Sequence, residues 1–234
     1  MKNFFEEYYD FTTSSVVGNS VNRLVYRHNL FMDSISFKDK TVLDLGSHDG
    51  RWSFAAAEKG AKSVTSVEYN KVLLEKAELI REKYAWGNVE FIEDDNLRFL
   101  KNTDRKFDII LCCGVFYHTM NHLEYFNYMS EACREAIILD TNVWPSKDAM
   151  VYVTLEKSSW DGNSYRNTKF NLDDEHRDTI AGIPSESYIQ ILAKSFGLEH
   201  TKLDYPITNQ QGLGDYVMKQ RCAYILRPEL NTSC

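Results

Sequence analysis

Residues 42–52 read VLDLGSHDGRW: an apolar run, a turn of small and polar residues, and the start of a helix-like stretch. In an open α/β sheet, ligands bind beyond the carboxyl ends of strands of this kind. Gly46 and Gly50 can adopt positive φ angles and let the backbone approach a ligand closely. The stretch therefore predicts a buried strand followed by a ligand-binding loop.

The regions around this stretch alternate between strand-like and helix-like patterns. Short apolar runs predict strands at residues 41–45, 63–67, 89–92, 107–112 and 136–139, and helix-like stretches lie at 51–58, 70–84, 96–100 and 122–133. Apolar strands with little polar alternation are buried on both faces, which is typical of a parallel sheet covered by helices. The pattern predicts an α/β protein with a doubly wound sheet.

The chain is expected to form one domain, residues 1–234, because no linker divides it. Its expected parts are an N-terminal helical cap (1–37), a nucleoside-binding core (38–142), an insertion that shapes the acceptor pocket (143–184), and a C-terminal helix with edge strands (185–234). The insertion carries one clear strand run, at residues 149–155, and Ser185 is expected to cap the helix that follows it.

The composition is that of an acidic globular protein. The 234 residues carry a formal net charge of −7, and 43% of them are hydrophobic, which excludes a disordered chain. The longest apolar stretch, residues 109–116, is far shorter than the ~20 residues that span a bilayer, and the first residues lack the pattern of a signal peptide. Five cysteines without framework spacing fit reduced thiols. We expect a cytoplasmic protein without membrane association, and its oligomeric state stays open.

Three kinds of nucleotide site are possible for the loop after residue 45. The Gly-Lys-Ser/Thr tripeptide of a phosphate-binding loop does not occur in the chain, and a dinucleotide fingerprint would need glycines where His48 and Arg51 stand. Asp44 repels phosphate but suits a sulfonium or ammonium group. Glu68 ends the next strand run, where a carboxylate can accept both hydroxyls of a ribose. The pattern favours a nucleoside that carries a sulfonium amino acid; the alternative is a tight turn that binds nothing.

Four segments resemble, in the family's order, the motifs of class I S-adenosylmethionine-dependent methyltransferases. They are residues 44–50 (DLGSHDG), 67–70 (VEYN), 91–96 (FIEDDN) and 107–114 (FDIILCCG). His48 departs from the pattern, since the family usually has a glycine there. The resemblance implies a Rossmann-like, mostly parallel seven-stranded sheet with an N-terminal lid helix, an insertion after the fifth strand, and S-adenosylmethionine as the cofactor.

The resemblance also implies which residues bind the donor: Asp44, Gly46, Ser47, His48, Gly50, Glu68, Tyr69, Asp95, Asn96 and Gly114. Asp44 and Gly46 would contact its amino-acid end, and Glu68 its ribose. Tyr69 and Asn96 would lie against the adenine, whose amine Asp95 would bind, while Gly114 would leave room near the sulfonium. For Asp95 the alternative is an exposed acid that begins a helix, and Asp94 competes for the role.

Residues 114–118 (GVFYH) follow the predicted fourth strand, at the edge where methyl transfer would occur. His118 is the candidate general base, because imidazole titrates near neutral pH. Tyr117 is the second candidate catalytic residue, through a hydrogen bond to the acceptor or a ring contact with the sulfonium. The alternative for His118 is a histidine of the core or a helix cap. This run also resembles the corresponding segment of tRNA wobble-uridine carboxymethyltransferases.

No metal site is expected. His118 and His122 have helical spacing, but Thr119 stands where the zinc protease motif needs glutamate. Residues 140–142 (DTN) only partly match the magnesium ligands of catechol-type methyltransferases. In the first long helix, Arg27 and its neighbours either pair with the donor's carboxylate or are surface charges.

The expected function is methyl transfer to an oxygen or nitrogen atom of a small molecule. The alternatives are a tRNA wobble-base modifying enzyme that uses S-adenosylmethionine or a carboxylated derivative, and a nucleoside-binding pseudoenzyme. The acidic charge and the lack of a basic arm count against nucleic acid as the partner. An NAD-dependent oxidoreductase is disfavoured because two fingerprint glycines are missing.

Overall fold

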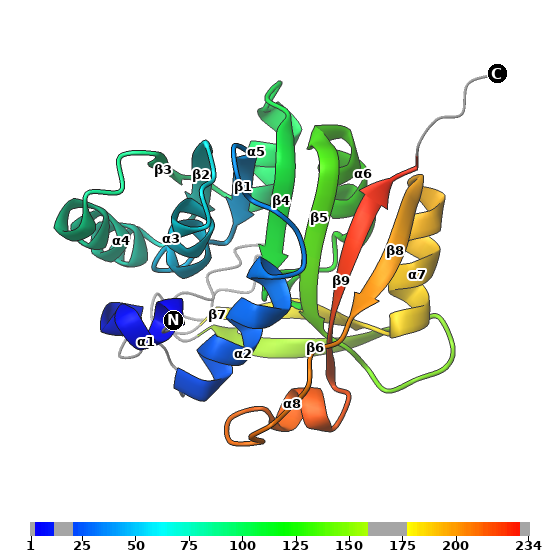
Figure 1. Ribbon diagram of the computed structural model, residues 1–234. Coiled ribbons are helices and arrows are strands. Elements are labelled where there is room, and N and C mark those ends of the chain that lie inside the picture. The colour runs from blue at the N-terminus through cyan, green and yellow to red at the C-terminus, as the bar shows by residue number, and fades with distance from the viewer. Residues whose placement is uncertain (1–2, 12–20, 159–176, 230–234) are drawn as a thin grey trace.

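The computed structural model describes residues 3–11, 21–158 and 177–229. Within these residues the main sheet has seven strands: β1 (Thr41–Leu45), β2 (Ser63–Glu68), β3 (Val89–Glu93), β4 (Phe107–Cys113), β5 (Cys133–Asn142), β8 (Leu198–Leu203) and β9 (Arg221–Pro228). Their order across the sheet is β3-β2-β1-β4-β5-β9-β8, and only the pairings of β9 with β5 and β8 are antiparallel (Figure 1). The predicted doubly wound, mostly parallel sheet is therefore confirmed.

Helices cover both faces of this sheet. On one face lie α1 (Phe4–Glu7), α2 (Val21–Met32), α3 (Arg51–Glu58) and α4 (Lys71–Tyr84), and on the other α5 (Asn96–Asn102), α6 (His122–Ala132) and α7 (Glu186–Ser195). Successive strand residues point to opposite faces, so Val42 joins the first core and Leu43 the second. This is why the strands read as continuous apolar runs. Short helices at η1 (Tyr9–Phe11), η2 (Phe116–His118) and α8 (Gly214–Val217) complete the described helical elements.

The insertion differs from its prediction. It contains two strands rather than one, β6 (Val151–Ser158) and β7 (Arg177–Pro184), which pair with each other as a separate antiparallel sheet. The sequence of β7, RDTIAGIP, has no regular alternation of apolar residues, so its strand depends on pairing with β6. β6 and β7 cross below the main sheet in Figure 1. The division of the chain into four parts stays a prediction.

The carboxyl ends of the parallel strands come together at one edge of the sheet. Leu45 at the end of β1 is level with Val67 on β2, and Cys113 at the end of β4 is level with Asp140 on β5. In Figure 1 this edge faces down, toward α2, α8 and the β6–β7 pair. The loops that carry the predicted motifs therefore meet here.

Polar side chains begin several of the helices. The side chain of Asn70 accepts a hydrogen bond from the Val72 amide at 2.9 Å, and that of Ser185 caps α7 as predicted. Asp95 caps α5 by accepting from the amide of Arg98 at 2.9 Å. The helix-starting interpretation of Asp95 is thus what the structure shows, and its role toward a donor stays a prediction.

Candidate functional site

The loop after β1 requires glycine at position 46. Gly46 has φ +64°, and its amide donates to the carbonyl oxygen of Val67 and to Oδ1 of Asn96, at 2.9 Å each. A Cβ atom here would clash with Cγ2 of Val115 and lie 3.3 Å from Nδ2 of Asn96. Gly46 thus lies where β1, β2, α5 and the segment after β4 converge.

His48 occupies the position where the family usually has a glycine, and the structure gives the reason for that preference. Its φ angle is +55°, in the left-handed region that favours glycine. Its amide donates to Oε2 of Glu68 at 2.9 Å, and the amide of Asn70 donates to Oε1 of the same carboxylate at 2.8 Å. Glu68 therefore joins the loop after β1 to the loop after β2.

Glu68 is buried, with 6% of its surface exposed. Burial raises its pKa, while the hydrogen bonds from the Asn70 and His48 amides oppose that shift. A bound ribose would add hydroxyl donors to the same carboxylate.

Asp44 lies beneath this loop and is 1% exposed. Ser53 donates to its Oδ2 at 2.6 Å, and the hydroxyl of Ser53 also contacts that of Ser66. Burial raises the pKa of Asp44 to about 7, because few hydrogen bonds compensate for the lost hydration of its charge. A cation bound nearby would stabilise the ionised form of Asp44.

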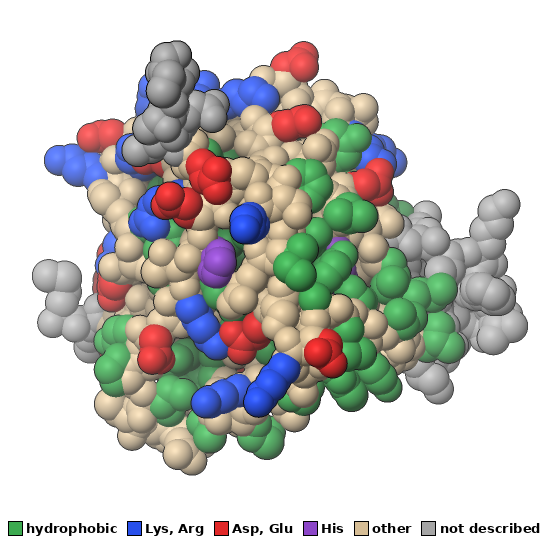
Figure 2. Space-filling model, turned by 90° about the vertical axis from the view of Figure 1, so that its right-hand side faces the viewer, with side chains coloured by type: hydrophobic (Ala, Val, Ile, Leu, Met, Phe, Trp, Pro, Cys, Tyr) green, Lys and Arg blue, Asp and Glu red, His purple; other side chains and the backbone are tan. Residues whose placement is uncertain are grey.

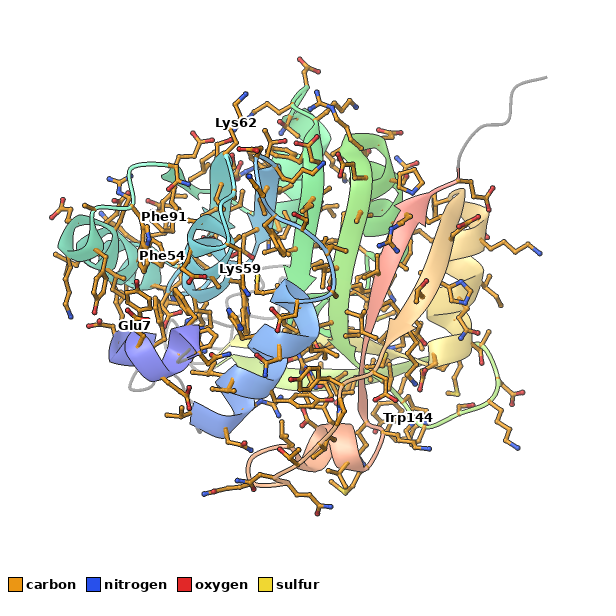
Figure 3. The ribbon with its side chains drawn as sticks, viewed as in Figure 1. Glu7, Phe54, Lys59, Lys62, Phe91 and Trp144 are labelled. Carbon is orange, nitrogen blue, oxygen red and sulfur yellow. The ribbon has the colours of Figure 1, made fainter. Side chains whose placement is uncertain are left out.

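The other loop residues have mainly structural contacts. Gly50, with φ +77°, begins α3, and a Cβ atom there would lie 2.7 Å from Phe54 and 3.1 Å from Phe91. These two rings lie side by side in Figure 3, with centroids 5.7 Å apart. Ser47 is buried, and its Oγ has no hydrogen-bond partner within the described part of the chain. Tyr69 follows Glu68 and is partly exposed.

Sequence reasoning did not identify the ion pair inside this loop. Asp49 is fully buried and accepts from Nε and Nη2 of Arg51 at 2.7 and 2.9 Å. Burial alone would raise the pKa of Asp49, but the guanidinium of Arg51 lowers it well below its usual range. Arg51 therefore folds back onto its own loop. The spacing of Asp49 and Arg51, two residues apart at a helix start, was the available signal.

The segment after β4 brings together the two candidate catalytic residues. Gly114 has φ +94°, and η2 follows it with Tyr117 and His118, whose ring centroids are 3.9 Å apart. His118 is 8% exposed, and its amide donates to the carbonyl oxygen of Val115 at 3.0 Å. Strand β7 packs on η2, where a Cβ atom on Gly182 would lie 3.0 Å from the carbonyl oxygen of Thr119.

His122 supports this segment. Its ring stacks on Phe116, with centroids 4.3 Å apart, and its Nε2 lies 3.2 Å from the Phe116 carbonyl oxygen. Burial lowers the pKa of His122 to about 4 and keeps the imidazole neutral. Among the residues that the structure describes, no three metal-binding side chains gather into a possible metal site.

A charged cluster at the end of β5 was also missed; we call it the Asp140 cluster. Asp140 is fully buried and accepts from Nη2 of Arg27 on α2 at 2.6 Å, from Nε of Arg221 on β9 at 2.9 Å, and from the hydroxyl of Tyr216 on α8 at 2.6 Å. Burial alone would raise the pKa of Asp140, but the guanidiniums of Arg221 and Arg27 lower it well below its usual range. Arg27 is thus paired inside the protein and is not a surface charge.

Three comparisons place this chain among known proteins. A family model described as "Methyltransferase domain" matches residues 36–174, more than half of the chain. Protein arginine N-methyltransferase 1 of Caenorhabditis elegans is 31% identical over 111 residues, which cover 46% of this chain and 32% of that protein. A tRNA U34 carboxymethyltransferase of Helicobacter acinonychis (strain Sheeba) is 28% identical over 120 residues, which cover 48% of this chain and 44% of that protein. The chain thus spans less than half the length of these curated relatives.

Solved structures show the same fold. The N-terminal domain of EvdMO1, crystallised with SAH and D-fucose, superposes with a TM-score of 0.62 at 18% identity, covering 88% of this chain and 82% of that one. A structure titled as a putative S-adenosylmethionine dependent methyltransferase from Listeria monocytogenes has a TM-score of 0.61 at 14% identity. The match covers 87% of this chain and 97% of that one. No helix in the described part of this chain is both long and apolar enough to cross a membrane.

Proposed function

This chain belongs to the methyltransferase domain family, and we propose that it transfers a methyl group from S-adenosylmethionine to an oxygen or nitrogen atom of a small-molecule acceptor. The family match confirms the resemblance that the four sequence motifs carry. Membership of this family implies methyltransferase activity with S-adenosylmethionine as the cofactor. The acceptor and the residue roles below are our proposal.

The observation that carries the proposal is the meeting of three loops at one sheet edge. Gly46 contacts Val115 and Asn96, and Glu68 accepts from the His48 amide. A nucleoside lying along this edge would meet Glu68 with its ribose, and Tyr69, Asp95 and Asn96 with its adenine. Its amino-acid end would lie over Asp44 and the loop of residues 46–50, and its sulfonium near Gly114.

The chain's own residues then have definite tasks in the reaction. When bound, S-adenosylmethionine would supply an activated methyl group to a lone pair of the acceptor and would leave as a neutral thioether. The protein aligns the acceptor with that methyl group and excludes water. His118 accepts the proton that the acceptor loses, and Tyr117 positions the acceptor beside the sulfonium. The burial of His118 beneath β7 supports a water-poor position.

The surface supports a small acceptor. The chain carries a net charge of −7, and on the face drawn in Figure 2 acidic, basic and apolar side chains are interspersed. Nucleic-acid binding usually needs a continuous basic face. The second candidate function is modification of tRNA, which the tRNA U34 carboxymethyltransferase relatives and the Tyr117–His118 run favour.

One experiment separates these functions. Protein is incubated with methyl-labelled S-adenosylmethionine and either a small-molecule cell extract or total tRNA. We expect label in the small-molecule fraction and none in tRNA, and a strongly reduced small-molecule signal with the Glu68→Ala control. Label in tRNA would replace the small-molecule acceptor with the second candidate. Donor binding by calorimetry without transfer to either pool would support a pseudoenzyme instead.

A further inference from the structure

The Asp140 cluster contains more positive than negative charge. Arg27 and Arg221 are 8% and 7% exposed, and both donate to the single carboxylate of Asp140. The nearby Arg23 does not change this balance, because it pairs with Asp215 through two hydrogen bonds of 2.6 and 2.7 Å. Among the side chains that the structure describes here, two buried guanidiniums thus share one carboxylate.

An uncompensated buried charge is costly, so buried guanidiniums are normally fully paired. The remaining groups of Arg221 are satisfied in part by Oδ1 of Asn142, at 2.8 Å, which is neutral. Arg27 is not fully satisfied: its Nε is buried and has no hydrogen-bond partner among the residues that the structure describes. Within the described residues the cluster therefore carries one net positive charge, and the Nε–H of Arg27 is an unpaired donor.

The two guanidiniums of the cluster lie next to Gly114. A Cβ atom on Gly114 would lie 3.3 Å from Nη2 of Arg221 and 3.6 Å from Nη2 of Arg27, so both guanidiniums closely approach the backbone at Gly114, where only glycine leaves them room. The ring of Tyr117 lies 5.5 Å from the guanidinium carbon of Arg221. The cationic pair thus adjoins both the proposed sulfonium position and a candidate catalytic residue.

We propose that Arg27 and Arg221 bind a carboxylate of the acceptor beside Gly114, so that the substrate class is a small carboxylic acid methylated at another oxygen or nitrogen. A carboxylate supplies the single negative charge that the cluster lacks, and its two oxygens match guanidinium geometry. Ion pairing lowers the nucleophilicity of those oxygens, which makes this group an anchor and leaves a different atom to accept the methyl group. This inference rests on the proposed function.

The donor's own amino-acid carboxylate is the other source of the same chemistry. The position of the cluster favours the acceptor. Asp140 lies on β5, which β4 separates from β1, whereas the donor's amino-acid end is placed at the loop after β1. The experiment distinguishes the two sources.

The probe is formate, a carboxylate small enough to bind without contacts to the rest of the pocket. Because the guanidinium of Arg27 lies 5.0 Å from the centroid of the Trp52 ring, tryptophan fluorescence reports on the site. Formate is titrated into protein saturated with S-adenosylhomocysteine, with formamide and chloride as neutral and ionic-strength controls. Of the three additives, we expect only formate to bind in a saturable manner. Arg27→Gln should weaken it roughly tenfold or more, the loss of a charge-assisted hydrogen bond. Arg23→Gln, one turn earlier on α2, should leave it unchanged.

The other outcomes are each decisive. If S-adenosylhomocysteine binds but formate gives no more response than chloride, the acceptor anchor is wrong and the proposed function stands. If formate binds only the free protein and is displaced by S-adenosylhomocysteine, the carboxylate belongs to the donor and the acceptor assignment is overturned. If S-adenosylhomocysteine itself does not bind, the proposed function fails and this inference fails with it. The titration of the wild-type protein decides the proposal by itself, so the test remains valid even if the Arg27→Gln variant misfolds.

Discussion

The carboxylate of Glu68 accepts a hydrogen bond from the backbone amide of His48 at 2.9 Å, across the gap between the loops after β2 and β1. One residue thus ties the predicted ribose site to the loop predicted to hold the donor's amino-acid end. The bond also helps to keep His48 at its φ angle of +55°. We therefore expect donor binding and loop geometry to be coupled through Glu68.

Glu68→Ala should weaken binding of S-adenosylmethionine by roughly 1.5–3 kcal/mol, the scale of hydrogen bonds to a charged group. Glu68→Gln keeps the size of the side chain and one acceptor oxygen, so its loss should be smaller. Calorimetry measures both affinities, and circular dichroism checks the fold. Unchanged affinity in a folded Glu68→Ala protein would remove Glu68 from the donor site.

The backbone at His48 predicts an unusual order of stabilities. His48→Gly should be more stable than His48→Ala by about 1 kcal/mol, because alanine is strained at a positive φ angle and glycine is not. Chemical denaturation provides the measurement. At exposed Glu75 within α4 the order should reverse, with alanine better by about 1 kcal/mol. The same order at both positions would contradict the left-handed geometry of His48.

Asp44 should make stability and donor binding respond to pH in opposite directions. Its pKa of about 7 in the folded protein lies above the ordinary value of 3.8, so the folded state prefers the protonated form. The stability that Asp44 contributes is complete below its ordinary pKa and is lost as the pH rises through about 7. Asp44→Asn should therefore be the more stable protein above neutrality, by on the order of 3 kcal/mol.

Donor affinity should instead increase with pH through the same range, because a cationic donor stabilises the ionised Asp44. Asp44→Asn should bind more weakly and lose this dependence. Denaturation and calorimetry at a series of pH values measure the two trends. A wild-type affinity that is flat across neutrality would show that Asp44 does not face the donor's charge.

His118→Asn should keep donor affinity and reduce turnover about 10²–10⁴-fold if the imidazole accepts the acceptor's proton. If turnover survives within a factor of a few, the acceptor is already nucleophilic and the protein acts by positioning. Joint loss of thermal stability and donor binding would identify His118 as a packing residue.

Much of the core could be predicted because its signals are local. The expected bounds of β1 and α3 agree with the structure at both ends, and the other core strands differ by three residues or fewer at each end. Buried parallel strands are marked by continuous apolar runs, and the turn after β1 by its glycines. Strand β7 was not predicted because its sequence has no regular apolar alternation and its strand conformation depends on pairing with β6.

The segments of the candidate donor site could be located for the same reason, since each motif lies at or just beyond the carboxyl end of a strand. The roles of their residues toward a donor stay predictions. What the sequence by itself determined is therefore the fold class, the family and the segments that meet at one sheet edge. Only the tertiary structure decided how these segments are held together. Asp140 lies 113 residues from Arg27 and 81 from Arg221, and no pattern within a helix or strand marks the three as partners. Buried charges find their partners through space, because each must be compensated wherever the chain folds.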